Sequence, residues 1–276
     1  MPRFFTLFIC SFLFFTSCSL FDREEPVPAY IHIEKIKSSN IADPHPFTDA
    51  WIYLDNRFMG VYEVPATFPL LAEGHHTITV KPGIKVNGIS SSRDVYPFMV
   101  KYDTSFTLVP EKQYELRPKT SYKSGLTTAW YENFESITHD ILRTSRSDTS
   151  MRFVDSTANS GVRCGAVFLD EVRNNFDAYS GQTMNLPLKV PVFLEMSYKN
   201  TNTFSVGLYF YQNGQLQVES IVIIYASAAW KKIYIDLSTT INKTTDDAQF
   251  KLALAAVLNQ GLTSGYILVD DLRIIY

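Results

Sequence analysis

The chain of 276 residues has only three cysteines, twelve glycines and no block of basic residues. Three cysteines cannot build the disulfide framework that holds small secreted domains together. A formal net charge of −3 without a basic cluster suits nucleic acid poorly, so we expect no nucleic-acid partner. The low glycine content excludes a collagen-like chain, and a hydrophobic content of 46% excludes a disordered one.

The motifs of several enzyme classes are also missing. The chain has no Gly-x-Ser-x-Gly elbow, no phosphate-binding glycine loop, no His-Glu-x-x-His and no Cys-x-x-Cys. The acidic pairs Asp170-Glu171, Asp246-Asp247 and Asp270-Asp271 are adjacent in sequence, and neighbouring residues of a strand point to opposite faces. None of them is a ready pair for glycosidic bond cleavage, which needs two carboxylates across a cleft. We therefore expect a protein that is not an enzyme and rank glycoside hydrolase activity last.

An apolar segment opens the chain. Residues 4–15 follow Arg3 and are rich in phenylalanine, which suits a signal-peptide core but is too short to span a bilayer. Phe15-Thr16-Ser17-Cys18 then resembles the lipobox of Bacteroidetes-type bacterial lipoproteins, although Phe15 stands where an aliphatic residue is usual. The resemblance implies a signal peptide at 1–17 and acylation of Cys18, which would anchor the mature chain to the outer membrane.

Residues 18–28 have the composition of an acidic, proline-containing linker, with Asp22, Glu24 and Glu25 before Pro26. Acidic residues directly after the lipidated cysteine resemble the surface-export signal of Bacteroidetes lipoproteins, which implies display on the cell surface rather than toward the periplasm. A solvated linker is the alternative interpretation. With Cys10 in the signal peptide and Cys18 acylated, Cys164 has no partner and is expected to be a buried small apolar residue.

Alternating apolar residues and turn signals predict many short strands in residues 29–118. Asp55-Asn56 is suited to a hairpin turn with positive φ. Segments 50–60, 65–74 and 76–83 resemble a PEGA-like small β-sandwich, with a strand, a turn, a proline segment and a final Gly-x-His-x-Ile-x-Val pattern. The resemblance implies a structural or binding module of the cell envelope.

Residues 119–129 are polar and are expected to link this domain to a second β domain at 130–276. Strands are predicted there at 130–135, 151–154, 162–169, 191–199, 203–211, 216–225, 230–237, 249–257 and 265–276. A short helix is predicted within 136–146. The fold class expected for the whole chain is all-β, with two β-sandwich domains.

Three segments of the second domain carry a further resemblance. Residues 130–135 (WYENFE), 229–237 (AWKKIYIDL) and 265–275 (GYILVDDLRII) are similar to a carbohydrate-binding-module type jelly roll, in which the first and last strands lie side by side. The resemblance implies a structural calcium ion shared by Glu135 and Asp270. The alternative is that both carboxylates are solvated or cap turns.

A tyrosine-bearing face is the remaining candidate site. In the strand at 204–211, Leu208 and Phe210 point to one face and Tyr209 and Tyr211 to the other, where Tyr179 could join them. Aromatic rings stack on the apolar faces of sugars. The same rings would also suit a protein interface or simple cross-strand pairing.

Two functions follow from these features. The first is a non-catalytic accessory subunit that docks on an outer-membrane complex for transport, secretion or nutrient uptake. The alternative is a surface lipoprotein that binds glycan. An open groove in which Tyr209 and Tyr211 lie beside polar side chains would favour glycan.

The lipid anchor is testable through Cys18. We expect Cys18→Ala to move the protein from the membrane fraction to the soluble fraction, because acyl chains supply about 0.8 kcal/mol of membrane affinity per buried CH₂. Fractionation of cells followed by immunoblotting measures the distribution, with Cys164→Ala as the control. Equal membrane retention of both variants would refute acylation at Cys18.

Overall fold

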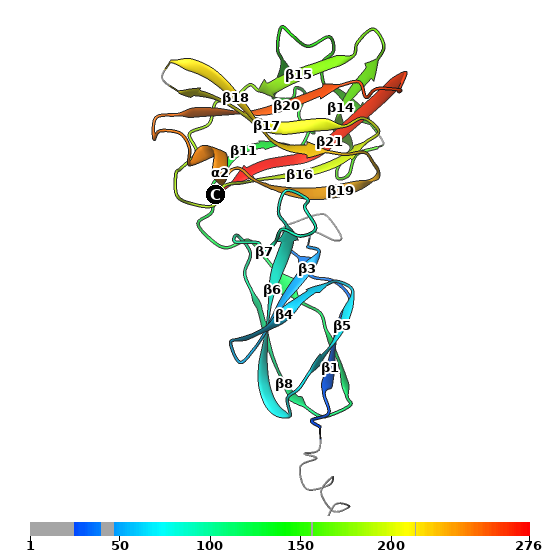
Figure 1. Cartoon of the computed structure of the whole chain (residues 1–276), viewed down its shortest axis with the longest axis vertical. Coiled ribbons are helices and arrows are strands. Elements are labelled where there is room, and N and C mark those ends of the chain that lie inside the picture. The colour runs from blue at the N-terminus through cyan, green and yellow to red at the C-terminus, as the bar shows by residue number, and fades with distance from the viewer. Residues whose placement is uncertain (1–24, 40–46, 156, 213) are drawn as a thin grey trace, which may run out of the picture.

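The computed structural model describes residues 25–39, 47–155, 157–212 and 214–276. Within these ranges the regular elements are strands apart from one short helix, α2 (Ser238–Ile241). The expected all-β class is therefore confirmed. The strands form two bodies joined end to end, so that β1 lies near one end of the molecule and the C-terminal sandwich forms the other (Figure 1).

The N-terminal body consists of β1 (Ala29–Ile33), β2 (Lys37–Ser38), β3 (Asp49–Leu54), β4 (Arg57–Glu63), β5 (Ala66–Leu70), β6 (Gly74–Lys85), β7 (Arg93–Val95), β8 (Tyr102–Leu108), β9 (Gln113–Leu116) and β10 (Lys119–Thr120). One sheet has the order β4-β3-β6-β7, with β8 beside β6, and a second has the order β5-β1-β9. Asp55 and Asn56 have positive φ angles of 47° and 67° and close the β3–β4 hairpin, as predicted.

The C-terminal body is built from β11 (Thr128–Glu132), β12 (Ile141–Arg143), β13 (Arg152–Asp155), β14 (Arg163–Asp170), β15 (Asn175–Ser180), β16 (Phe193–Asn200), β17 (Phe204–Gln212), β18 (Gln215–Ile224), β19 (Ser227–Asp236), β20 (Gln249–Val257) and β21 (Ser264–Ile275). Its sheets have the orders β13-β14-β21-β16-β19, with β11 beside β21, and β12-β15-β20-β17-β18. The first and last strands, β11 and β21, are antiparallel neighbours. This is the sandwich expected from the jelly-roll resemblance.

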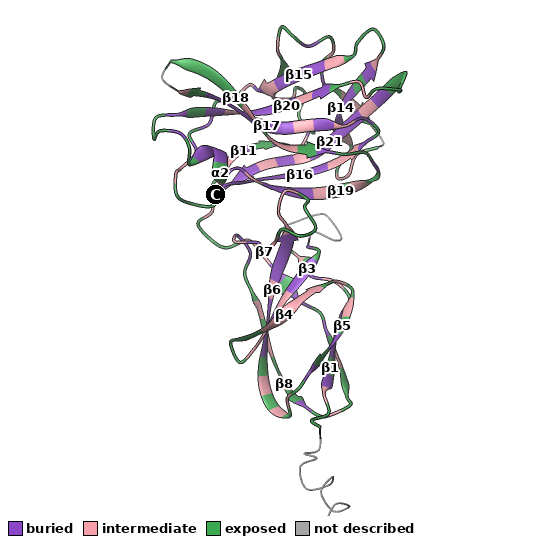
Figure 2. Cartoon of the chain, viewed as in Figure 1, coloured by how far each residue is buried: buried purple, intermediate pink, exposed green. Residues whose placement is uncertain are grey.

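Each body has its own hydrophobic core, and the N-terminal core extends into the junction. The inward residues of the two C-terminal sheets form one buried cluster, and buried positions alternate with exposed ones along many strands (Figure 2). The N-terminal cluster includes Phe193, Tyr234 and Ile275, which belong to β16, β19 and β21. The two bodies therefore share apolar packing at their junction.

A buried carboxylate lies at this junction. Glu195 of β16 is 1% exposed and accepts hydrogen bonds from the hydroxyls of Tyr96 (2.5 Å) and Tyr122 (2.7 Å). Its other contacts are the cations Arg273 (3.1 Å) and Lys232 (3.4 Å). Burial alone would raise the pKa of Glu195, but the two cations and the two hydroxyl donors outweigh it and hold the pKa below its ordinary value.

Some local expectations were wrong. Residues 136–146 contain no helix but the short strand β12, which pairs with β15 through Leu142 and Tyr179. β15 was not expected, because its sequence, Asn-Phe-Asp-Ala-Tyr-Ser, is half polar. The segment expected as a linker, 119–129, contains β10 and the start of β11. Cys164 is fully buried, as predicted.

We expect the buried carboxylate of the junction to contribute more to stability than a surface carboxylate. Glu195→Gln leaves Lys232 and Arg273 without their anion in a desolvated site, so we expect the free energy of unfolding to fall by about 3–5 kcal/mol. Glu219→Gln is the matched control, because Glu219 pairs with Lys243 at the surface and exposed pairs contribute less than about 1 kcal/mol. Urea unfolding at neutral pH measures both. Losses of similar size would contradict the assigned importance of Glu195.

Candidate functional site

The outer face of the sheet β12-β15-β20-β17-β18 carries the predicted tyrosines. Tyr209 and Tyr211 lie on β17, whereas Leu208 and Phe210 between and beside them point into the core. Tyr209 is directly opposite Lys251 of β20, so both side chains point to the same face. Tyr179 of β15 lies on that face as well, and all three tyrosines border one groove of about 460 Å³.

Tyr209 forms the floor of this groove, and its position is fixed by polar contacts. Its ring is 7% exposed, its hydroxyl donates to Asp177 Oδ1 (2.6 Å), and the same hydroxyl accepts from Arg146 Nη2 (2.9 Å). Arg146 also binds Asp177 Oδ2 through Nε (2.8 Å). Burial and the bond to Asp177 raise the pKa of Tyr209 to about 12, so the hydroxyl stays protonated at neutral pH.

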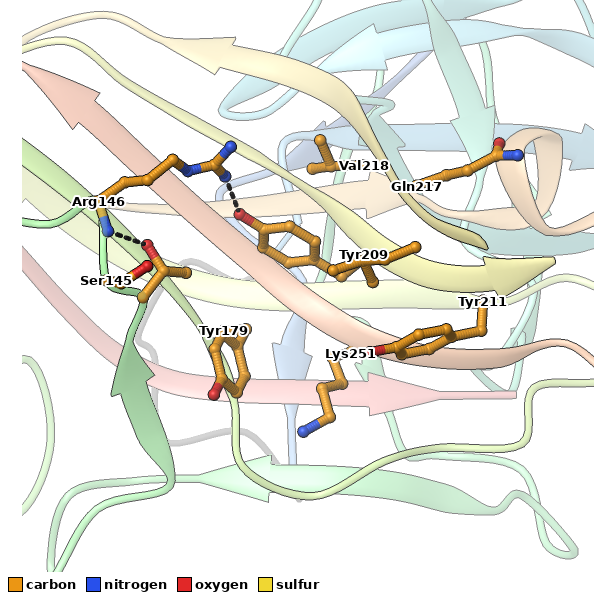
Figure 3. A pocket seen from close by; sticks show the side chains of 10 residues that line it. Ser145, Arg146, Tyr179, Tyr209, Tyr211, Gln217, Val218 and Lys251 are labelled. Atoms are coloured by element: carbon orange, nitrogen blue, oxygen red, sulfur yellow. Dashed lines mark hydrogen bonds between the residues drawn. The ribbon is translucent and has the colours of Figure 1, made fainter. Parts of the chain in front are cut away.

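Tyr179 and Lys251 form a second fixed pair. The Lys251 ammonium lies 4.6 Å from the centre of the Tyr179 ring and donates to the carbonyl oxygen of Gly181 at 3.0 Å. The Tyr179 ring meets the Tyr209 ring edge to face, with centroids 6.1 Å apart. Figure 3 shows the three tyrosines around the groove, with Arg146 reaching the Tyr209 hydroxyl. The rings and cations are thus held in place without a ligand.

The exposed side of the groove is formed by β18 and β17. On β17, Tyr211 is 54% exposed. On β18, Leu216 lies opposite Tyr211 and Val218 lies opposite Tyr209, and each of these two side chains is 55% exposed. Thr144 and Ser145 add hydroxyl groups at the border, whereas the side chain of Gln217 points away from the tyrosines (Figure 3). The groove therefore combines aromatic and aliphatic surface with hydrogen-bonding groups, the usual composition of a small-molecule site.

The sequence predicted the tyrosines but not the residues that surround them. Alternation along one strand was enough to place Tyr209 and Tyr211 on a common face. Lys251 could not be added because its register against Tyr209 depends on which strands pair. Arg146 and Asp177 were missed for different reasons. Arg146 is the last residue of the segment expected to hold a helix, and Asp177 lies in the unexpected strand β15.

Glu135 and Asp270, the expected calcium ligands, are placed at one turn, 159–163. Asp270 is buried, and its Oδ2 accepts the backbone N–H groups of Asn159 (2.9 Å) and Ser160 (3.1 Å). Glu135 Oε1 accepts those of Val162 (2.9 Å) and Arg163 (2.8 Å). The two carboxylates therefore bind opposite ends of the turn.

This arrangement does not fit a shared cation, because N–H dipoles present positive charge to both carboxylates. Among the described residues, no three histidine, cysteine, aspartate or glutamate side chains come together where a metal could be held. Calcium stays an untested prediction for which these two residues offer no fitting ligand set.

A second hollow, of about 350 Å³, lies in the N-terminal body. It is bordered by four cationic side chains, Lys35, Lys37, Arg117 and Lys119, together with Glu34 and Leu116. Lys37 and Lys119 are directly opposite each other on the parallel strands β2 and β10. The cationic side chains are at least partly exposed, and no aromatic ring borders this hollow.

Nothing is described of Cys18, which lies outside the described residues. Within the described ranges, no helix has both the length and the apolar character needed to cross a membrane. The lipid anchor, the outer-membrane location and an outer-membrane partner stay predictions.

Comparisons with known proteins find distant structural neighbours. Neither a protein-family model nor a curated protein matches the sequence. One similar solved structure is a two-module fragment of endo-1,4-β-D-xylanase 10B from Clostridium thermocellum in complex with xylohexaose (TM-score 0.39, 17% identity, 54% of this chain). The chain covers only 28% of that longer protein.

Two other neighbours are matched over nearly their whole length. The family 11 carbohydrate-binding module of a Clostridium thermocellum cellulase has a TM-score of 0.35 and 14% identity, over 54% of this chain and 94% of that one. The K3 adhesin domain of Lys-gingipain from Porphyromonas gingivalis has a TM-score of 0.39 and 15% identity, over 55% and 99%. The neighbours thus include carbohydrate-binding-module domains, and the PEGA-like character of the N-terminal body stays a prediction.

The buried carboxyl of Asp270 predicts a pH effect on stability. Burial raises its pKa from 3.8 to about 7, although the backbone N–H of Ser160 opposes the rise. The folded chain then keeps a proton that the unfolded chain has lost, so this group makes stability fall as pH rises from about 4 to about 7. We expect Asp270→Asn to abolish that fall, measured by urea unfolding across this interval. Asp170→Asn is the control, because Arg173 lowers the pKa of Asp170 and moves its titration below this range. The same slope in wild type and Asp270→Asn would contradict the assignment.

Proposed function

We propose that the groove on the outer face of β15, β20, β17 and β18 binds carbohydrate. The observation that carries the proposal is the convergence of Tyr179, Tyr209 and Tyr211 on one groove beside polar side chains. Some of the distant structural neighbours are themselves described as carbohydrate-binding modules, but the proposal rests on the residues of this groove.

The exposed surfaces of the groove suit a pyranose ring. Sugar rings have apolar C–H faces, which aromatic rings can cover, and hydroxyl edges, which need hydrogen-bond partners. Tyr211 offers an accessible ring, and Leu216 and Val218 extend the apolar surface beside it. Thr144 and Ser145 lie at the border, where ring hydroxyls would point.

Preorganisation is the second argument. Tyr209 is fixed by Asp177 and Arg146, and Tyr179 is covered by the ammonium of Lys251. Side chains that are already ordered lose little conformational entropy when a ligand arrives. A sugar, which offers modest apolar area, gains more from such a rigid surface than from a mobile one.

We propose a non-catalytic role for the chain, as a surface lipoprotein that binds glycan. The groove favours this alternative over the accessory-subunit interpretation, for which the described residues supply no specific observation. β1 and the C-terminal sandwich lie at opposite ends of the molecule (Figure 1). An anchor at Cys18, which precedes β1 in the sequence, would therefore leave the groove on the part of the protein far from the membrane.

Tyr211 offers the most direct test. We expect Tyr211→Ala to weaken glycan binding about tenfold, because a stacking contact of about 1.4 kcal/mol would be lost. Titration calorimetry with oligosaccharides from xylan, mixed-linked β-glucan and β-1,4-galactan measures the affinity. Tyr211 is already half exposed, so the variant should unfold at nearly the wild-type temperature.

Tyr225→Ala is the matched control, because Tyr225 is 75% exposed and does not border the groove. It should bind the same oligosaccharide with unchanged affinity. Equal weakening in both variants would place the binding surface elsewhere, and the absence of binding by the wild-type protein to a broad glycan panel would overturn the proposal.

A further inference from the structure

The groove has two cations but only one carboxylate beside them. Arg146 and Lys251 both border the groove, and Asp177 beneath it pairs with Arg146 at 2.6 Å. In the part of the chain that the structure describes, no ion pair joins Lys251 to a carboxylate. The groove therefore carries an excess positive charge, although the chain as a whole has a net charge of −3.

Resting on the proposed carbohydrate binding, we infer that the preferred ligand is an acidic glycan whose carboxylate pairs with Lys251. An ammonium has three N–H donors, of which one reaches the carbonyl oxygen of Gly181. The remaining donors are available to a ligand. The ammonium lies 4.6 Å from the centre of the Tyr179 ring, and Arg146 lies at the Tyr209 hydroxyl. A uronate ring that covers these two tyrosines therefore has a cation near each of them.

The same charge discriminates against neutral sugars. A neutral ring that covers Lys251 removes water from the ammonium without supplying an anion, and an unpaired charge is costly to desolvate. A uronate supplies the missing negative charge at the same position. Lys251 thus favours acidic glycans both by attraction and by the penalty that it places on neutral competitors.

The test compares acidic oligosaccharides with their neutral counterparts. The probes are oligogalacturonate, oligomannuronate and glucuronate-bearing xylan oligosaccharides, each beside its carboxyl-reduced form, which differs only in the charged group. We expect the wild-type protein to bind at least one acidic probe about tenfold more tightly than its reduced form, as for a hydrogen bond to a charged group. The preference should shrink as salt is added.

Variants then assign the preference to one side chain. We expect Lys251→Met, which keeps the aliphatic stem, to abolish the preference for the acidic probe, and Lys251→Arg to restore most of it. Lys37→Met and Lys119→Met remove the same charge from the basic hollow of the N-terminal body and should change nothing. Thermal unfolding of each variant verifies that the fold is intact.

The possible outcomes distinguish failure of the inference about Lys251 from failure of carbohydrate binding itself. Equal binding of acidic and reduced probes, or a preference that survives in Lys251→Met, overturns the inference about Lys251 and leaves carbohydrate binding standing. A preference lost in Lys37→Met or Lys119→Met assigns acidic glycans to the basic hollow and also overturns it. If neither acidic nor neutral oligosaccharides bind the wild-type protein, carbohydrate binding itself fails.

Discussion

The burial of a single charge at the domain junction constrains the whole molecule. Glu195 is removed from water, and a buried carboxylate is tolerated only when cations and hydrogen-bond donors surround it. Its partners come from both bodies: Tyr96 and Tyr122 from the N-terminal side, Lys232 and Arg273 from the C-terminal side. Neither body alone satisfies the charge, so the contact specifies how the two are arranged.

The same alternation of inward and outward side chains places both the junction residues and the groove residues. Along β16, Leu194 and Met196 point into the sandwich core, and Glu195 between them points outward to the N-terminal body. The facing sheet repeats the pattern on β17, where Leu208 and Phe210 fill the same core and Tyr209 points to the outer face, at the floor of the groove. One outer face of the sandwich thus contacts the N-terminal body, and the other carries the groove that we propose to bind glycan.

The binding capacity of the groove depends on which of its side chains already have hydrogen-bond or ion-pair partners within the chain. Asp177 pairs with Arg146 and accepts the Tyr209 hydroxyl, so these groups are held in fixed positions at the groove. Lys251 and the ring of Tyr211 are left with capacity for a ligand. A ligand with an apolar face and one negative charge matches both, and this is the description of a uronic acid ring.

Much of this protein could be predicted from local sequence. Period-two alternation placed Tyr209 and Tyr211 on one face, and asparagine and aspartate at 55–56 specified a hairpin turn, because both effects act within a few residues. The composition of 249–257 favours a helix, and the strand there was predicted from the jelly-roll resemblance of neighbouring segments rather than from local sequence. In contrast, β15 has no strong local pattern and exists because β12 and β20 pair with it.

The sequence by itself determined the all-β class, the inward and outward faces of the main strands, and the candidate tyrosines. Only the tertiary structure decided that Lys251 lies opposite Tyr209, that Arg146 reaches across to Asp177, and that Glu195 is shared between two bodies. The physical reason is range: side-chain alternation is set by neighbouring peptide units, whereas strand register and charge pairing depend on residues far apart in sequence that meet only after the sheets have packed.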